Sequence, residues 1–561
     1  MKVRKILISS FFVILQNIIL SQEKIPNSFR FPLDGEMRVG GNYGELRPNH
    51  FHAGLDLSTD PVLNLPIYSI DAGYISRVKI SSYGYGKVLY VTHPGGFVSV
   101  YAHQHHFAER IADYVYSEQK KLESFEVEVF PKPNELPVSK GEIIGYTGNT
   151  GGSTGPHLHF EIRDEITETP LNPLLFYEHN DADTPFVNKM TIYSISNGIP
   201  YLVRSITFNS KNFKGGIWKG DTIILPENAG LAFSCFDKGI KNAGLNQVYG
   251  IRIKVDGEIF YEHKMNNIGF EVTRCVNWFQ ETDPAYKSAK IQKCFKVGNN
   301  ELPIFGKMKN GGVISATQLP ENKVHQVQAE FWDIKGNTAS LKFDFVFSGQ
   351  KLVENVLPIN LFFARSNRLD FGDAVFEFPE KCLFNDSKST VRFFRKNPGT
   401  LYSDVYSVLT KGTLLMKKYN LRIKINREVS ADLQNKLCLV ELDNNMHLAG
   451  YIGGDFSGNF LQSETYDCGL IAIGLDNVPP VITPLTKKRG STISFRVKDN
   501  LSGIGKFRME INGNWVLSEY EHKENMIYCR LPQETTTGPL MVSLTVYDKR
   551  DNASVIKVKI K

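Results

Sequence analysis

At 561 residues the chain is too long to fold around one hydrophobic core, and usual domain sizes predict about two to four domains. Basic residues exceed acidic residues by only six. This slight excess does not support binding to nucleic acid, and we predict no nucleic-acid partner.

The first residues have the pattern of a cleaved export signal. A basic start over residues 1–5 is followed by an apolar run over residues 6–15 and by a small residue, Ser21. We predict a signal peptide over residues 1–21 and export to the periplasm, the cell envelope or the extracellular space. The apolar run is shorter than the roughly 18 residues that a membrane span needs, so we expect no span after cleavage.

The stretch from Gly44 to Asp56 contains the first candidate metal ligands. It reads Gly-Glu-Leu-Arg-Pro-Asn-His-Phe-His-Ala-Gly-Leu-Asp and places His52 four residues before Asp56. In a straight strand these two residues would lie about 13 Å apart, too far for ligands of one ion. The backbone must therefore bend between them, and Gly54 can adopt the dihedral angles that such a bend needs.

Residues 66–101 alternate short apolar runs with Gly and Pro, which predicts an antiparallel sheet. His103 follows directly. Over residues 107–122, apolar side chains recur at helical spacing, so we predict an amphipathic helix inserted into an otherwise β domain. The helix could form one wall of a substrate groove or simply pack on the surface. The sheet resumes at residues 141–146.

A second pair of candidate ligands lies in Gly155-Pro-His-Leu-His-Phe-Glu161. Alternate side chains of a strand share a face, so His157 and His159 point the same way while Leu158 and Phe160 face the core. Neutral imidazole is the commonest protein ligand for transition metals, and such a pair needs only a distant third ligand to form an open zinc site. Alternation alone does not say which of the two histidines would bind the metal.

The glycine-rich residues 148–155 precede this strand and read Gly-Asn-Thr-Gly-Gly-Ser-Thr-Gly. A phosphate-binding loop would end in Gly-Lys-Ser or Gly-Lys-Thr and would lead into a helix. We therefore interpret the segment as a flexible rim that lets a peptide backbone approach the histidines.

Together these motifs resemble the lysostaphin-type zinc endopeptidases, the M23 or LytM-like family, which cut peptide bonds in bacterial cell walls. The similarity runs from about residue 41 to residue 176, with the motifs in the family's order and spacing. The motifs are Phe-His-Ala-Gly-Leu-Asp, Tyr-Gly-Tyr-Gly-Lys-Val, Tyr-Ala-His, Gly-Asn-Thr-Gly-Gly-Ser-Thr-Gly and Pro-His-Leu-His-Phe-Glu. The resemblance implies that His52, Asp56 and His159 bind Zn²⁺. It also implies that His103 and His157 are catalytic histidines without a metal bond.

The resemblance implies an exported zinc metalloendopeptidase that hydrolyses peptidoglycan stem peptides or cross-links. The D-Ala to diaminopimelate cross-link is the expected bond in a Gram-negative cell, ahead of glycine-rich bridges and extracellular proteins. The alternative is a non-catalytic cell-wall-binding protein or a regulator of wall amidases, which some relatives became by losing zinc ligands. The intact set of ligands argues against that alternative. Because every candidate residue lies there, we expect residues 22–180 to suffice for hydrolysis.

Beyond a linker at residues 181–185, alternating runs bounded by Gly, Asn or Asp predict β-sandwiches. A weak internal similarity relates the segment starting at Asp237 to the segment starting at Asp499. We predict a mainly β chain, in which an antiparallel β-sheet metallopeptidase domain with an inserted helix precedes β-sandwich (Ig-like) modules. The expected bounds are 22–180 for the peptidase domain, 186–350 for a sandwich, 351–477 for a β-rich module and 478–561 for an Ig-like sandwich. We expect these modules to bind a cell-surface or wall partner.

The seven cysteines all lie beyond the predicted peptidase domain. None is near enough in sequence to a histidine or another cysteine to indicate a zinc motif. Export permits disulfides, but an odd number leaves at least one thiol unpaired. A bridge between Cys275 and Cys294 and buried free thiols in the sandwich cores are the two expectations.

Overall fold

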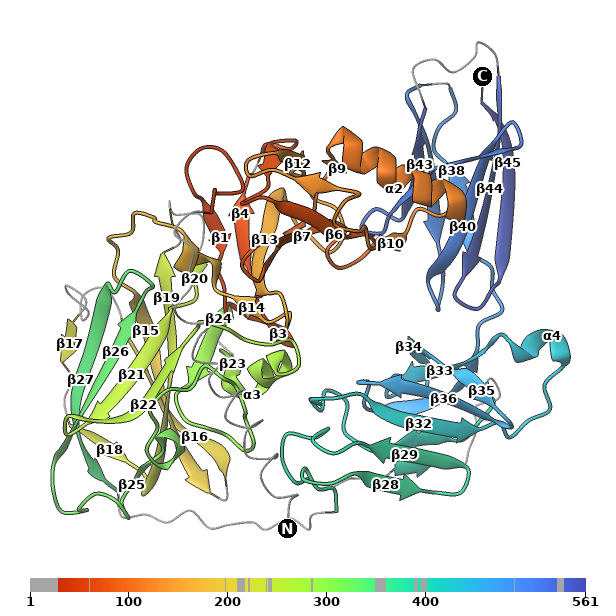
Figure 1. The fold of residues 1–561 in the computed structure, drawn as a ribbon. Coiled ribbons are helices and arrows are strands. Elements are labelled where there is room, and N and C mark those ends of the chain that lie inside the picture. The colour runs from red at the N-terminus through yellow and green to blue at the C-terminus, as the bar shows by residue number, and fades with distance from the viewer. Residues whose placement is uncertain are drawn as a thin grey trace, which may run out of the picture.

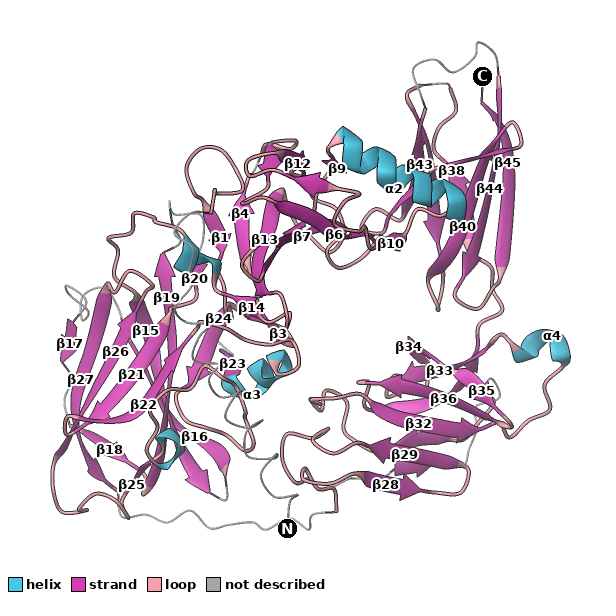
Figure 2. Ribbon diagram, in the orientation of Figure 1, coloured by secondary structure: helices cyan, strands magenta, loops and turns pink. Residues whose placement is uncertain are grey.

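The computed structural model describes residues 29–560, apart from positions 60, 197, 209–216, 220–221, 239, 241–244, 284–285, 349–359, 388–391, 395–400, 489 and 532–538. The predicted signal peptide over residues 1–21 lies outside the described residues. In the described part of the chain, no helix is long and apolar enough to cross a membrane. Strands dominate the fold, as Figure 2 shows, which confirms the predicted mainly β class.

The N-terminal region is built on a large antiparallel sheet with two small sheets beside it. The large sheet has the order β1 (Val39–Gly41), β4 (Leu55–Ser58), β13 (His157–Asp164), β8 (Phe97–Ala102), β7 (Lys87–His93), β6 (Gly73–Ile80) and β10 (Val127–Val129). To it are added β11 (Pro137–Val138) on β6 and β14 (Pro170–Leu171) on β13. The small sheets contain β5 (Pro66–Tyr68), β12 (Ile143–Tyr146) and β9 (His106–Phe107), and β2 (Leu46–Arg47) with β3 (His50–Phe51). A 3₁₀ turn, η1 (Pro173–Phe176), follows the last strand.

The inserted helix is present as α2 (Glu109–Leu122), as the helical spacing predicts. Its Ile111 and Val115 are buried in the core of this domain. The apolar stripe is shorter than the sequence indicates, because Phe107 lies in β9 and Leu122 is 64% exposed. Figure 1 shows α2 beside the C-terminal sandwich, and an ion pair between Glu123 and Arg508 joins the two.

The next region forms two sheets that enclose their own core. One contains β16 (Ile199–Thr207), β15 (Phe186–Ser196), β19 (Asn228–Lys238), β24 (Tyr286–Lys293), β23 (Gln280–Asp283), β20 (Leu245–Asn246) and β25 (Ile314–Ser315). The other contains β17 (Ile217–Lys219), β18 (Ile223–Leu225), β27 (Thr338–Phe347), β26 (His325–Trp332), β21 (Gly250–Val255) and β22 (Glu258–Lys264). Short helices η3 (Thr273–Cys275), α3 (Val276–Phe279) and η4 (Asn310–Gly312) connect them. Both β17 and β18 run parallel to β27.

Two further sheet pairs follow, each again with its own core. One sheet of the first pair contains β28 (Asn367–Asp370), β29 (Ala374–Phe378), β32 (Tyr419–Lys424), β36 (Phe460–Thr465) and β35 (Asp455–Ser457). The other sheet contains β30 (Arg392–Phe394), β31 (Val405–Ser407), β37 (Leu470–Leu475), β33 (Leu437–Leu442) and β34 (Leu448–Gly453). The short helix α4 (Ala431–Gln434) lies between β32 and β33 in the chain. The second pair contains β38 (Val481–Pro484), β39 (Thr492–Lys498), β43 (Met526–Arg530) and β42 (Glu519–Glu521), packed with β41 (Asn514–Val516), β40 (Ile504–Ile511), β44 (Leu540–Asp548) and β45 (Ala553–Ile560).

All seven cysteines are buried free thiols. The suggested bridge between Cys275 and Cys294 is therefore wrong, and the alternative of buried thiols holds. Cys275 packs in the cluster that also contains Val276 and Phe279, whereas Cys294 belongs to the core of the sandwich. The two side chains thus contribute apolar surface to two different packing clusters.

A separate buried cluster joins the N-terminal domain to the sandwich that follows it. The side chains from the N-terminal domain are Tyr43, Leu46 and Phe51, and those from the sandwich region are Met265, Ile268, Cys275, Val276, Phe279, Leu302 and Ile304. The ring centroids of Phe51 and Phe279 are 5.8 Å apart, and the Phe51 N–H donates to the Thr273 hydroxyl. The segment that leads into His52 is therefore buried against the next module.

We expect residues 22–180 to suffice for hydrolysis, and this cluster adds an expectation about the stability of that fragment. A fragment of residues 22–180 would expose Tyr43, Leu46 and Phe51, whereas a fragment of residues 22–348 keeps them covered. Since exposed apolar patches of this kind promote self-association, we expect the short fragment to unfold at a lower temperature and to associate more than the long one. Thermal unfolding and size-exclusion chromatography of the two fragments measure this difference. Equal stability of the two fragments would show that the cluster does not support the peptidase domain.

Candidate metal centre

Strand pairing brings two of the predicted ligands together. β13 lies between β4 and β8, and its register places His159 directly opposite Asp56 on β4. Directly opposed residues of an antiparallel pair have Cβ atoms only about 4.5–5.5 Å apart. Leu158 and Phe160, the alternate residues of β13, are fully buried in the core, as the alternation predicts.

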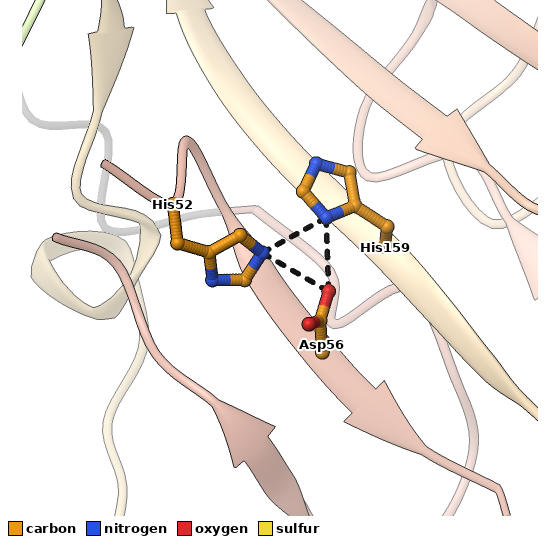
Figure 3. Close-up of side chains that lie close together, drawn as sticks. All are labelled: His52, Asp56 and His159. Atoms are coloured by element: carbon orange, nitrogen blue, oxygen red, sulfur yellow. Dashed lines mark hydrogen bonds and ion pairs between the residues drawn. The ribbon is translucent and has the colours of Figure 1, made fainter. Parts of the chain in front are cut away.

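The third predicted ligand, His52, reaches the same point from the segment after β3. Its Nε2 lies 3.0 Å from Asp56 Oδ1 and 3.0 Å from His159 Nδ1. Asp56 Oδ1 lies 2.9 Å from His159 Nδ1. Figure 3 shows the three side chains converging, with one atom of each pointing toward a common centre. Residues that the sequence separates by more than a hundred positions thus form one compact triangle of donor atoms.

The bend between His52 and Asp56 has a different basis from the one expected. Gly54 does not have a positive φ. A Cβ built on it would lie 2.3 Å from the backbone oxygen of Phe160 and 2.8 Å from the side chain of Glu161. Glycine is therefore required because β13 passes so close to this backbone, which leaves no room for a side chain.

Hydrogen bonds to the outer ring nitrogens orient both histidines. His52 Nδ1 lies 2.8 Å from the backbone oxygen of Asn42, and His159 Nε2 lies 2.8 Å from Glu161 Oε1. In the neutral rings, donation of the N–H from each of these nitrogens to an oxygen leaves the opposite nitrogen with its lone pair. The inward-facing atoms are therefore His52 Nε2 and His159 Nδ1, the arrangement that metal-binding histidines adopt.

The residues around Glu161 were not assigned a role from the sequence. Glu161 is completely buried, and its Oε2 accepts a hydrogen bond of 2.7 Å from Arg163 Nε. The Tyr85 hydroxyl donates to Glu161 Oε1, and the Tyr85 ring stacks on His159 with centroids 5.2 Å apart. The same alternation that pairs His157 with His159 also places Glu161 and Arg163 on that face, so the signal was present in the pattern. Tyr85 comes from a distant turn, and no local pattern indicates its position.

Arg47 and Glu45 support Asp56 at the carboxylate oxygen that does not face the histidines. Arg47 lies on β2 and donates from Nη2 to Asp56 Oδ2 at 2.5 Å and to Glu45 Oε2 at 2.9 Å. Because one carboxylate oxygen is taken up by Arg47, the other, Oδ1, remains directed at the two histidines. The motif over residues 44–56 therefore supplies two candidate ligands, His52 and Asp56, and also Arg47, which orients Asp56.

The charges of these groups favour a cation between the three side chains. Burial would raise the pKa of Asp56, but the charge of His52 and the hydrogen bonds from the surrounding histidines hold it well below its usual value. Burial lowers the pKa of His52. Burial would also lower the pKa of His159, but hydrogen bonds to Asp56 and Glu161 and the charges of these residues raise it to about 9. The carboxylates therefore attract positive charge to the position where a metal ion would lie.

The structure places His103 and His157 at the edge of the triangle. The His103 ring centroid lies 4.8 Å from that of His157 and 5.9 Å from that of His159. His103 Nδ1 lies 2.8 Å from the Thr150 backbone oxygen, and His157 Nδ1 lies 2.9 Å from the Gly155 backbone oxygen. Both bonds go to the glycine-rich segment, so this segment orients the two histidines. His103 also has a φ of 59°, which is uncommon for a residue other than glycine.

Burial, followed by the charges of His159 and His157, lowers the pKa of His103 to about 3. His103 is therefore neutral across the physiological pH range when no metal is present. Its Nδ1–H is donated to Thr150, so the lone pair is on Nε2.

His93, His50 and His106 are not among the three residues whose donor atoms form the triangle. His93 is buried, with Nε2 2.7 Å from the Ser99 hydroxyl and Nδ1 2.9 Å from the Ala72 oxygen. His50 and His106 are exposed, and the His106 ring stacks on Tyr146. The hydrogen bonds of His93 and the stacking of His106 give these two residues structural roles.

The C-terminal sandwich also contacts the rim of the centre, which the sequence did not indicate. Lys523 donates from Nζ to the backbone oxygens of Asn149 at 2.5 Å and Ser153 at 3.3 Å, both in the glycine-rich segment. Lys87 forms an ion pair of 2.7 Å with Glu519. The last module of the chain is therefore in direct contact with the segment that orients His103 and His157.

Comparisons with known proteins find two family matches along the chain. Residues 123–173 match the profile of peptidase family M23, and residues 360–476 match that of a Zu5-like domain. The DD-carboxypeptidase/endopeptidase Mpg of Neisseria meningitidis serogroup B is 31% identical over 123 residues, which cover 22% of this chain and 22% of that protein. Lysostaphin of Staphylococcus simulans is 23% identical over 242 residues, which cover 41% of this chain and 42% of that protein. A solved zinc containing peptidase from Vibrio cholerae is 22% identical with a TM-score of 0.20, covering 28% of this chain and 41% of that chain.

The chain thus carries a peptidase domain of the M23 family, and a Zu5-like β domain follows closer to its C-terminus. This confirms the resemblance found in the sequence. The match spans only about a fifth of the length of the Mpg proteins.

Replacing Gly54 by alanine tests the close approach of β4 and β13. We expect Gly54→Ala to force the two strands apart, since the new methyl group would overlap backbone rather than a flexible side chain. The expected loss of stability is about 1–3 kcal/mol, the usual cost of overpacking. Gly155→Ala is the matched control, because nothing lies within 4 Å of a Cβ at that position. Thermal unfolding of both variants should show a lowered transition for Gly54→Ala alone, and an unaffected Gly54→Ala variant would contradict the packing described.

Proposed function

We propose that the protein is an exported zinc metalloendopeptidase that hydrolyses peptide bonds of peptidoglycan. One observation carries the proposal: two imidazole nitrogens and one carboxylate oxygen, from His52, His159 and Asp56, lie within 3.0 Å of one another. The match to peptidase family M23 supports the reaction class.

The donor set fits zinc in both chemistry and size. Two nitrogens and one carboxylate oxygen are the ligands of catalytic zinc sites, which keep a fourth position open. Tetrahedral bonds of about 2.0–2.1 Å require ligand atoms about 3.3 Å apart. The observed separations of 2.9 and 3.0 Å need only a small expansion to meet that value. The carboxylate Glu161, which accepts from the outer nitrogen of His159, is the kind of partner that fixes a histidine ligand.

When bound at this centre, zinc supplies a Lewis acid that lowers the pKa of water and polarises a carbonyl group. The protein itself supplies groups that hold and move protons. His103 Nε2 carries a lone pair because its Nδ1–H is donated to Thr150, and His157 lies beside it. We assign to His103 and His157 the orientation of the attacking water, the transfer of its proton and the stabilisation of the developing negative charge.

The names of the relatives support the choice of substrate. One relative is named as a DD-carboxypeptidase/endopeptidase, a class that acts on bonds between D-amino acids. We propose a peptide cross-link of peptidoglycan as the substrate, with the D-Ala to diaminopimelate bond as the first candidate. Export is part of the same proposal, since this substrate lies outside the cytoplasm. The modules after residue 180 would then hold the peptidase domain against a wall or cell-surface partner.

Digestion of purified sacculi tests the activity directly. Protein purified without added metal should contain about one zinc per chain, and it should release muropeptides whose masses identify the bond that was cut. Removal of zinc should abolish this release, and its return should restore it. A zinc-loaded protein that binds sacculi without releasing any muropeptide would instead support a wall-binding or regulatory role. A metal-free protein with full activity would contradict the proposed mechanism.

Three single substitutions separate the proposed ligands from the proposed proton-transfer groups. His159→Ala should lose the zinc and the activity together, because it removes one of three protein ligands. His103→Ala and His157→Ala should keep the zinc but lower kcat by about 10²- to 10⁴-fold, the usual contribution of a general acid or base. His106→Ala is the control, since that histidine is exposed and stacks on Tyr146.

Zinc stoichiometry and turnover measured side by side distinguish these roles. If His157→Ala lost its zinc while His159→Ala retained it, the two assignments would be reversed. The inward-facing nitrogen of His159 lies within 3.0 Å of both partners, which supports His159 rather than His157 as the zinc ligand.

A further inference from the structure

A second group of potential ligands lies between the peptidase domain and the sandwich that follows it. Asp181, Asp237 and Asp333 each direct a carboxylate oxygen to one place, and these oxygens lie within 4.8 Å of one another. Asp181 belongs to the linker after the peptidase domain, Asp237 to β19, and Asp333 follows β26 directly. Asp237 and Asp333 are only 7% and 3% exposed. Three carboxylates are thus held together where little water can separate their charges.

Within the described residues, no lysine or arginine forms an ion pair with these carboxylates, and burial lowers the pKa of His179, which lines the same cavity. The two nearby lysines pair with other acids, Lys238 with Asp183 and Lys335 with Glu178. Asp237 Oδ1 is buried and accepts no hydrogen bond from any described residue. Burial, and then the charges of Asp181 and Asp333, raise the pKa of Asp237 to about 7. The arrangement therefore lacks a positive charge that its geometry would accommodate.

An independent feature points to a bound ion. Asn246 is 5% exposed, lines the same cavity as the three aspartates, and has a side-chain oxygen to which no described residue donates a hydrogen bond. It lies on β20 directly opposite Asp237 on β19, so the two side chains are cross-strand neighbours. A buried amide oxygen without a donor costs free energy unless something else satisfies it. A cation at this point would satisfy Asn246 and Asp237 together.

A similar turn lies at a second junction, where the C-terminal sandwich meets the module before it, and the two turns can be compared. Asp333 accepts from the Asn337 N–H and side-chain amide, which also donates to the backbone oxygen of Asp181. Asp548, Asn552 and Asp476 repeat every one of these contacts at the second junction. This shared turn has a structural role in both modules and does not by itself indicate a ligand.

The two junctions differ at the remaining carboxylates. In the C-terminal sandwich, Asp476 accepts the Ser502 N–H at 3.1 Å and Asp499 accepts the Gly503 N–H at 2.8 Å. A backbone donor thus meets one oxygen of each carboxylate, whereas Oδ1 of Asp476 and Oδ1 of Asp499 accept no hydrogen bond from any described residue. Within the described residues, their oxygens do not form a group of potential ligands like the one at the first junction. Of the two junctions, the first is therefore the one at which three carboxylates converge.

We propose that Asp181, Asp237, Asp333 and the side-chain oxygen of Asn246 bind a Ca²⁺ ion. All four donors are oxygens, which hard cations prefer, whereas zinc sites include nitrogen or sulfur ligands. Ca²⁺ accepts six to eight oxygens in flexible geometry, so a partly open site that water completes is suited to it. Mg²⁺ demands a stricter octahedron, which a site shared between a linker and two strands does not readily provide.

The position of this site suggests what the ion would do. It would tie the linker at Asp181 to β19 and β20 of the sandwich. Gln247, the residue after Asn246, is bonded to the Asn42 side chain through its backbone. The Asn42 amide donates to the Gln247 backbone oxygen at 2.7 Å, and the Gln247 N–H donates to Asn42 Oδ1 at 2.9 Å. The Asn42 backbone oxygen accepts from His52. Ca²⁺ would therefore stabilise the junction that supports the segment carrying His52, without contacting the proposed zinc centre.

Calorimetric titration of the full chain with CaCl₂, after removal of loosely bound metal, tests the proposal. We expect Ca²⁺ to bind and to raise the unfolding temperature, with MgCl₂ at the same concentration giving a smaller effect. Asp237→Asn should weaken Ca²⁺ binding at least about tenfold. Without Ca²⁺, the same variant should unfold at the wild-type temperature or above, because it removes an unbalanced buried charge. A purely structural role for Asp237 would instead lower its unfolding temperature.

Two further variants make the result decisive. Asp181→Asn, at a partly exposed linker position, should also weaken Ca²⁺ binding and provides a second measurement if Asp237→Asn folds poorly. Asp183→Asn is the matched control, since it removes a carboxylate from the same linker outside the group. Zinc content should be equal in all of these proteins. Absence of Ca²⁺ binding by the wild-type chain, or equal loss of binding in Asp183→Asn, would overturn the proposal.

Discussion

The antiparallel pairing of β4 with β13 is the constraint on which the candidate centre depends. This register places Asp56 opposite His159, and a shift of β13 by one residue would turn His159 toward the core. The close approach at Gly54 makes that pairing possible, because a Cβ there would overlap the backbone of β13. Since β13 is also paired with β8, the ligand-bearing strand is held on both sides by backbone hydrogen bonds. Donor atoms on such a strand keep their positions more closely than donors on a free loop.

Charged groups are buried next to the three donor atoms, and other groups of the protein must balance their charges. Glu161 is fully buried, and it is stabilised by Arg163, by the Tyr85 hydroxyl and by His159. Breaking a buried pair of this kind leaves an uncompensated charge, which is more costly than the pair itself is stabilising. The arrangement therefore specifies one orientation of His159. The same logic applies to Asp56, whose second oxygen is held by Arg47.

The modules after the peptidase domain are structurally connected to its centre. The segment before His52 shares a buried cluster with the first sandwich, and Asn42 bonds to both His52 and Gln247. The last sandwich contacts the glycine-rich segment through Lys523. Figure 1 shows the chain returning so that its last module lies beside its first domain. The centre is thus supported from two sides by regions whose sequences carry no catalytic motif.

Local sequence patterns determined the mainly β class, the inserted helix, the shared face of His157 and His159, and the need for a bend before Asp56. These features depend on the spacing of neighbouring residues, which a sequence displays directly. The family resemblance, rather than spacing, singled out which histidine of β13 would bind a metal. Tertiary structure alone decided the rest: the role of Gly54, the contact of Tyr85 with Glu161, the free state of Cys275 and Cys294, and the meeting of Asp181, Asp237 and Asp333. Each of these features depends on segments that are far apart in the chain. Strand register and module packing determine where such segments meet, and no local pattern encodes either of them.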